Sequence, residues 1–357
     1  MAELVLTDEL VEAAVIGGAV LGGGGGGSMT WGRELAQLAV RMGTPRLVDS
    51  DDVNDNATLV TVSAVGAPAA KEAMVKPVGY VRAVQLLMEQ GAIKADGLIT
   101  NECGGTAVVN GWLQSAVLGI PIIDAPCNGR AHPTGAMGSM GLHATKDYVS
   151  YQAAVGGNPN SGRYLELFVQ GNIQQAAALV RQAAVQAGGL VAVARNPINA
   201  GYVKENAAPG AVRQAIGVGQ AMVSARYKGT KAVVEAAAKV LGGEIVTSGV
   251  VEKVELKTEG GFDSGRVLVG GLELTFWNEY MTLEKTDGTR LGTFPDLIMT
   301  LDQVTGTPVT TADIREEQQV AVLLVPRTKL RLGAGMRCPE LFEPAEQVTG
   351  KKLIDYL

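Results

Sequence analysis

The chain has 357 residues, of which 46% are hydrophobic and 18% are charged, and its formal net charge is −6. This length and composition predict two globular domains and exclude an intrinsically disordered protein. The negative net charge, together with the lack of any basic run, excludes a typical nucleic-acid-binding protein.

The sequence also argues against a membrane or exported protein. The apolar stretch Ala13–Leu21 is too short to cross a bilayer, and it follows acidic rather than basic residues, unlike a signal peptide. Cys103, Cys127 and Cys338 are odd in number and widely spaced, which favours a reducing compartment over a disulfide framework. We therefore expect a soluble, cytoplasmic protein that does not bind membranes.

Helical and strand patterns alternate through the first part of the chain. Helices are expected at Glu9–Ile16, from Ser28 or Thr30 to Arg41, at Lys76–Gln90 and at Thr106–Leu118, and strands at Arg46–Asp49, Thr58–Ala64, Gly97–Thr100 and Ile120–Asp124. This alternation predicts an α/β domain with a mostly parallel sheet, which we assign to residues 1–165.

Residues 166–357 are expected to form a helical segment followed by a β-rich domain. Helical spacing covers Leu165–Gln186 and Val212–Leu241, while Asn-Pro and Pro-Gly pairs indicate an irregular linker at Ala194–Gly210. Strands are expected at Glu244–Leu256, Gly265–Phe276, Tyr280–Lys285 and Gln319–Pro326, with a hairpin turn at Thr286–Thr289. The turn signals between these strands predict an antiparallel β domain.

The glycine run Gly22–Gly27 precedes a predicted helix. Converging backbone N–H groups and the start of a helix both favour an anion. No Gly-Lys-Ser/Thr follows, which argues against a nucleotide P-loop. The run is either a turn that permits close packing or part of a substrate site, in which Gly25, Gly26 and Ser28 would hold a carboxylate of a small substrate.

A second candidate segment, Asn101–Thr106, follows a predicted strand. Ligands bind outside the carboxyl ends of strands in open α/β sheets. Glu102 and Cys103 therefore lie where chemistry usually takes place, although a lone cysteine is most often a small buried residue.

A third segment, from Asp124 to His143, follows the next predicted strand and holds both histidines of the chain. Cys127 lies five positions before His132. The spacing is no standard zinc signature, yet a thiolate and neutral imidazoles suit a zinc-like ion. A Cys–His nucleophile pair is the competing interpretation.

Short motifs in order along almost the whole chain resemble the S-methyl-thiohydantoin desulfurase family. In the first part these are the glycine run, Val65–Pro68 with Lys71-Glu72, Glu102-x-Gly-Gly-Thr106, and Asp124 with Gly129-Arg-Ala-x-Pro133; in the second they are Ser224-Ala-Arg226, Asn278-Glu279, Pro295-Asp-Leu297 and Thr305-Gly306. The chain departs from the family pattern at Pro126-Cys127-Asn128, and at His132, where many relatives have Phe. These departures point to a subgroup with its own chemistry.

The resemblance implies a hydrolase that acts on a cyclic ureide or thio-ureide. Water would add to the ring carbon that bears the S-methyl group, and methanethiol would leave to give a hydantoin. A divalent metal, with zinc expected, would lower the pKa of a bound water to about 7. We expect this ion on Cys127, His132 and His143, with Asp124 or Glu102 as a base or as a hydrogen-bonding partner of the ligands.

Other residues are expected to hold the substrate. Arg130, Thr106 and the glycine run would bind ring oxygens or a carboxylate, and Glu279 and Asp296 would close the site from the second domain. Two alternatives stay open: attack by Cys127 on the ring carbon with help from His132, or a non-catalytic ligand-binding subunit beside a hydantoinase-type partner. We further expect a homo-oligomer.

Overall fold

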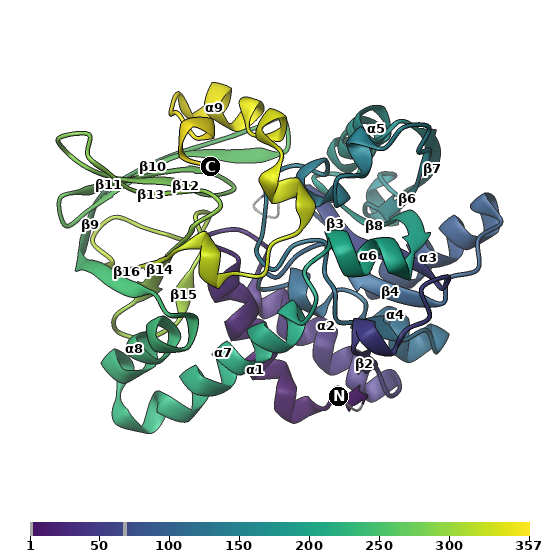
Figure 1. Cartoon of the computed structure of the whole chain (residues 1–357), viewed down its shortest axis with the longest axis horizontal. Coiled ribbons are helices and arrows are strands. Elements are labelled where there is room, and N and C mark those ends of the chain that lie inside the picture. The colour runs from purple at the N-terminus through teal and green to yellow at the C-terminus, as the bar shows by residue number, and fades with distance from the viewer. Residues whose placement is uncertain (1–2, 67–69) are drawn as a thin grey trace.

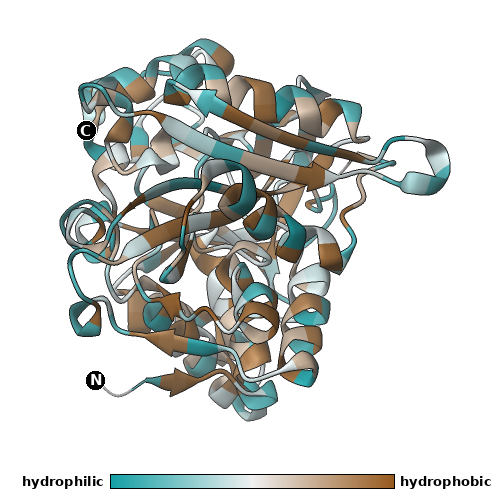
Figure 2. Ribbon diagram, turned by 90° about the vertical axis from the view of Figure 1, so that its right-hand side faces the viewer, coloured by the Kyte–Doolittle hydropathy of each residue, from teal (hydrophilic) through white to brown (hydrophobic). Residues whose placement is uncertain are grey.

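The computed structural model describes residues 3–66 and 70–357, so the motif Val65–Pro68 lies partly outside the described residues. Two sheets lie at opposite ends of the molecule, with α1 (Asp8–Leu21) and α7 (Ala211–Ala225) between and below them (Figure 1). Apolar and polar positions alternate along both the strands and the helices (Figure 2).

The first sheet has eight strands in the order β1-β2-β5-β4-β3-β8-β6-β7. These are β1 (Leu4–Val5), β2 (Arg46–Val48), β3 (Thr58–Gly66), β4 (Gly97–Thr100), β5 (Ile122–Ile123), β6 (Ser150–Gly156), β7 (Leu165–Gly171) and β8 (Leu190–Asn199). The central strands β2, β5, β4 and β3 pair in parallel, whereas β1, β8, β6 and β7 join antiparallel. The predicted α/β domain is confirmed, with a mixed sheet.

Helices cover this sheet and connect it to the second domain. They are α2 (Met29–Met42), α3 (Pro77–Gly91), α4 (Trp112–Leu118), α5 (Ile173–Gln186), α6 (Ala200–Asn206) and α8 (Thr230–Leu241), besides α1 and α7. α1 and α7 pack closely because glycines face backbone at their contact. A Cβ on Gly17 would lie 1.7 Å from the carbonyl oxygen of Ala215, and one on Gly219 would lie 1.8 Å from that of Ala13.

The second sheet is antiparallel throughout, with eight strands in the order β13-β12-β11-β10-β9-β16-β14-β15. These are β9 (Glu244–Glu259), β10 (Phe262–Val269), β11 (Leu272–Trp277), β12 (Glu279–Lys285), β13 (Arg290–Thr293), β14 (Leu297–Asp302), β15 (Pro308–Val309) and β16 (Gln319–Val325). The short α9 (Glu343–Thr349) follows near the carboxyl end. The predicted antiparallel β domain is confirmed, and the turn at Thr286–Thr289 joins β12 to β13.

The structure differs from the sequence-based expectation in the middle of the chain. Leu165–Gly171 is an edge strand and not the start of a helix, because it pairs with β6. Strand β8 and helix α6 replace the expected irregular linker, and the Asn199 side chain caps α6 by accepting from the Tyr202 N–H. The first sheet therefore continues past residue 165 to Asn199.

The expected helix Val212–Leu241 is divided into α7 and α8. The division lies at Gly229, whose φ of 92° favours glycine. None of the helices in residues 3–66 and 70–357 is long and apolar enough to span a membrane.

Candidate active site

A cavity of about 700 Å³ opens between the two domains. The α/β domain contributes the glycine run, the loop after β4 and the loop around His132, and the β domain contributes residues around Glu279. Sites for small molecules are often found at such domain interfaces. Charged or titratable side chains on its walls include Glu102, His132, Arg181, Arg195 and Glu279.

The glycine run forms one wall of the cavity and touches both domains. The carbonyl oxygen of Gly23 accepts from the N–H of Tyr280 at 2.8 Å, and that of Gly26 accepts from the N–H of Thr106 at 3.1 Å. A Cβ on Gly25 would lie 2.0 Å from Oε1 of Glu279. The run therefore has to be glycine here because backbone and carboxylate approach it closely.

The residues predicted to bind substrate beside this run do line the cavity. They are Gly25, Gly26, Ser28 and Thr106. Thr106 donates its hydroxyl to the carbonyl oxygen of Ser28 at 2.6 Å, and the Ser28 hydroxyl caps α2 by accepting from the Trp31 N–H. The start of α2 thus faces the cavity, where it favours an anionic group.

Glu102 and His132 meet on the wall of the cavity that the α/β domain forms. Oε2 of Glu102 lies 3.3 Å from Nε2 of His132, and the exposed fractions of the two side chains are 15% and 1%. The same oxygen accepts from the His132 backbone N–H at 3.2 Å and from Nδ2 of Asn101 at 3.2 Å. These bonds hold the carboxylate at the end of β4.

The tautomer of His132 follows from its neighbours. Arg195 donates to Oδ1 of Asn101 at 2.6 Å, which leaves the amide N–H₂ of Asn101 to donate to Nε2 of His132 at 3.0 Å. Nε2 is therefore an acceptor. Burial, and then the positive charge of Arg195, lower the pKa of His132 to about 3, so the imidazole is neutral at pH 7.

Two glutamates of the cavity wall, Glu102 and Glu279, have raised pKa values. Burial raises the pKa of Glu102 to about 7. Burial, and then the negative charge of Glu102, raise the pKa of Glu279 well above its ordinary value. Oε2 of Glu279 has no hydrogen-bond partner within the described residues. At neutral pH one group can thus accept a proton while the other carries one, as in acid–base catalysis.

Two arginines of the cavity were not predicted from the sequence. Arg195 lies on β8, where the register with β3 shifts and Asn196 has a φ of 53°. Such a bulge redirects side chains. Arg181 lies on α5, donates to the carbonyl oxygen of Gly261 at 3.0 Å and stacks over the ring of Phe262. The sequence signal that could have identified Arg195 is its position as a lone arginine in the apolar run of β8.

Asp124 has a structural role instead of the expected role as a base. Its carboxylate accepts from the backbone N–H groups of Val212 at 2.8 Å and Arg213 at 3.2 Å, at the start of α7. Burial is the main cause that raises its pKa to about 6. In the described part of the chain Asp124 does not line the cavity.

The structure does not bring Cys127, His132 and His143 together as ligands of one ion. Cys127 is fully buried, lies 3.4 Å from the hydroxyl of Thr61 and, among the described residues, is not part of the cavity wall. Burial raises the pKa of its thiol to about 11, which disfavours a thiolate. His143 instead faces Glu340 on the carboxyl-terminal segment.

Arg130 and Asp296 lie behind the cavity and support its walls. Arg130 is buried, donates to the carbonyl oxygens of Pro295 and Asp296, and stacks over Phe294 at 4.4 Å. The Asp296 carboxylate accepts from the N–H groups of Thr293 and Arg327. Neither side chain lines the cavity in the described chain. In place of the expected contact with substrate, Arg130 joins the two domains and the Asp296 carboxylate holds backbone within the β domain.

The fold and the cavity define a two-domain protein, with an α/β domain and an antiparallel β domain on either side of a cavity. Residues 9–162 match the family model described as "S-Me-THD-like, N-terminal domain", and residues 171–341 match the one described as "S-Me-THD-like, C-terminal domain". The chain therefore belongs to the S-Me-THD-like family, that of S-methyl-thiohydantoin desulfurase.

A solved structure has the same fold. The crystal structure of a protein from Chromobacterium violaceum aligns with a TM-score of 0.72 over 97% of each chain, at 21% sequence identity. No curated protein sequence matches the chain.

Proposed function

We propose that the protein is a hydrolase that removes the S-methyl sulfur from S-methyl-thiohydantoin-type rings. The observation that carries this proposal is the pair Glu102 and Glu279, which reach one cavity from two domains with raised pKa values. The family membership indicates the substrate class, and the carboxyl pair supplies a base and an acid.

In the proposed reaction, ionised Glu102 takes a proton from water while the water oxygen bonds to the ring carbon that bears sulfur. Protonated Glu279 donates to the ring nitrogen that receives the electron pair of the C=N bond. The C–S bond then breaks as the new hydroxyl group returns a proton to Glu279 and the departing sulfur takes the proton from Glu102. One water is consumed, one methanethiol is released, and both carboxyl groups regain their starting states.

The remaining polar groups of the cavity support this sequence of steps. His132 holds the Glu102 carboxyl group in place through its backbone N–H, while its ring nitrogen Nε2 accepts from Asn101. Arg181 and Arg195 bring positive charge to the cavity wall, where a ring oxygen or an acidic substituent of the substrate would bind. The start of α2 adds favourable potential for the same group.

The geometry supports this route better than the covalent alternative. Cys127 lacks access to the cavity and has a raised pKa, so attack by its thiolate is disfavoured. Water activation through an ion on Cys127, His132 and His143 lacks support as well, because these side chains are not assembled. Glu102 is positioned to activate water by itself.

The test is release of methanethiol by the isolated protein. The purified chain is mixed with S-methyl-thiohydantoin, and a thiol reagent follows the product while calorimetry follows binding of the unreactive hydantoin. The proposal predicts catalytic thiol release that disappears in Glu102→Gln and persists in Glu235→Gln, a change at an exposed carboxylate on α8. Binding of the ring without thiol release would overturn the proposed enzymatic activity and favour a ligand-binding subunit.

A further inference from the structure

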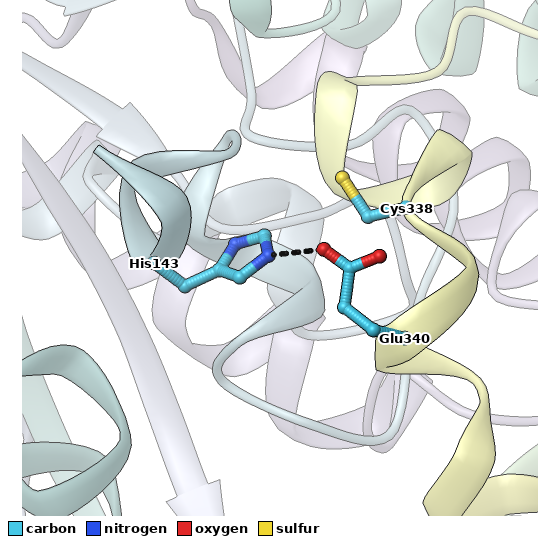
Figure 3. A group of neighbouring side chains, drawn as sticks. All are labelled: His143, Cys338 and Glu340. Atoms are coloured by element: carbon cyan, nitrogen blue, oxygen red, sulfur yellow. Dashed lines mark hydrogen bonds and ion pairs between the residues drawn. The ribbon is translucent and has the colours of Figure 1, made fainter. Parts of the chain in front are cut away.

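Three potential metal ligands meet away from the cavity, where the loop after β5 contacts the carboxyl-terminal segment. His143, Cys338 and Glu340 each offer one ligand atom, and these atoms all lie within 4.8 Å of one another. Figure 3 shows the imidazole and the carboxylate pointing at each other, with the cysteine sulfur beside them. Within the described residues this is the one such group of three.

The hydrogen bonds around His143 fix its tautomer. The Ser139 hydroxyl donates to the carbonyl oxygen of Ala136 at 2.6 Å, so its oxygen is left as an acceptor. Nδ1 of His143 lies 3.2 Å from that oxygen and therefore carries the proton. In the neutral ring Nε2 then bears a free lone pair, which is the form of histidine that binds metals. A metal-bound histidine is commonly oriented by a hydrogen bond that its other ring nitrogen donates, as Nδ1 does here.

The lone pair of Nε2 faces an oxygen with negative charge. Nε2 lies 3.2 Å from Oε1 of Glu340, and these two acceptors repel unless a metal ion or a proton lies between them. Two ligands about 2.1 Å from a tetrahedral ion are about 3.4 Å apart, so the observed separation fits one edge of such a site. The His143 side chain is only 4% exposed, whereas Glu340 is 57% exposed, which leaves an open path for the ion and for a water ligand.

We propose that His143, Cys338 and Glu340 bind one divalent ion of zinc type, with water as the fourth ligand. A nitrogen, a sulfur and a carboxylate oxygen are the donors that zinc takes in tetrahedral sites. The site joins the loop of residues 137–143 to residues 334–341, whose apolar side chains Met137, Met336 and Leu341 already pack together. Because His132 on the cavity wall precedes this loop in the chain, the ion would connect one wall of the cavity to the carboxyl-terminal segment.

The test uses untagged protein freed of metal by chelation and then loaded with zinc or cobalt. The proposal predicts one equivalent of zinc, a rise in the thermal unfolding midpoint on zinc addition, and a near-ultraviolet charge-transfer band from thiolate to cobalt. Cys338→Ser should abolish that band, and Cys127→Ser, a change at a buried cysteine outside the group, should retain it. Glu340→Gln should weaken zinc binding at least about tenfold, since even partners of metal ligands contribute 10–100-fold.

Each other outcome overturns the proposal. No cobalt band in the wild-type protein would mean that His143 and Glu340 form an ion pair only. Loss of the band in Cys127→Ser with retention in Cys338→Ser would move the ion to the set predicted from the sequence. Circular dichroism establishes that each variant is folded. Because Glu340 is exposed, Glu340→Gln is expected to fold and so to report on zinc binding alone. None of these readouts depends on turnover, so they are independent of the proposed desulfurase activity.

Discussion

Glu102 contacts His132 twice, since its Oε2 accepts from the backbone N–H of the histidine at 3.2 Å and lies 3.3 Å from Nε2 of the ring. Nε2 is an acceptor because Asn101 donates to it. Burial raises the pKa of Glu102 to about 7, while the hydrogen bond from the His132 backbone N–H acts in the opposite direction. The carboxyl group can thus gain and lose a proton at neutral pH, which is what a general base requires.

Replacement of Glu102 by Gln is expected to lower kcat by about 10²–10⁴-fold, because positioned proton transfer contributes that much. The amide keeps the size of the side chain but cannot take a proton from water. Steady-state thiol release measures the effect, with Glu235→Gln as the matched control. Retention of more than a tenth of the wild-type kcat would contradict a role for Glu102 as the base.

The pH profile of kcat/KM should rise with pH and level off above about 7. Only ionised Glu102 accepts a proton, and its pKa is raised to about 7, so the reactive fraction grows as pH increases through that value. The profile is measured under conditions where the enzyme stays folded across the range. A rate that falls between pH 6 and 8, or the same rise in the residual activity of Glu102→Gln, would assign the titration to another group.

Cys127→Ser is expected to leave kcat within a few-fold of the wild-type value. The thiol is buried against Thr61 and has a pKa of about 11, so it is not placed or charged for attack on the ring. Thiol release again supplies the measurement, and circular dichroism shows whether the variant is folded. A folded variant with a loss of more than about a hundredfold would restore the covalent mechanism.

Gly25→Ala is expected to lower kcat while Gly217→Ala does not. A Cβ at Gly25 would lie 2.0 Å from Oε1 of Glu279, so the acid would have to move away from the ring. A Cβ at Gly217 on α7 has nothing within 4 Å, which makes it a matched control. Alanine there should stabilise the fold by up to about 1 kcal/mol. Equal activity in the two variants would remove Glu279 from the proposed mechanism.

Asp124→Ala should lower the free energy of unfolding by about 1–3 kcal/mol, because the buried N–H of Val212 and the partly buried N–H of Arg213 would lose their acceptor. Denaturant unfolding measures this, and Glu235→Ala serves as the exposed control. A change as small as that of the control would mean that Asp124 does not hold the start of α7.

The periodic patterns were sufficient for the fold class and for several elements. The strands Thr58–Gly66, predicted as Thr58–Ala64, and Gly97–Thr100 were predicted because each is a short apolar run with β-branched residues. The edge strand Leu165–Gly171 was missed because its partner β6 was not predicted, and pairing between strands is not a local property. The bulge that turns Arg195 toward the cavity also depends on pairing.

The candidate site was predicted in part. Glu102 and His132 follow strands whose carboxyl ends meet, so sequence order placed both in the cavity. Glu279 came from the family resemblance. The predicted ligands Cys127, His132 and His143 are not assembled in the structure, because His143 faces the carboxyl-terminal segment, where Glu340 lies 197 residues later in the chain. Contacts at that separation cannot be read from spacing.

The most direct test of the central claim is to follow the oxygen atom of water into the ring product. S-methyl-thiohydantoin is converted by the wild-type protein in water labelled with oxygen-18, and the ring product is analysed by mass spectrometry. The account predicts methanethiol and a hydantoin that carries one oxygen-18 in equal amounts, with both products absent in Glu102→Gln. A bound ring that is recovered with its S-methyl group intact, under conditions where the cavity is saturated, would contradict it.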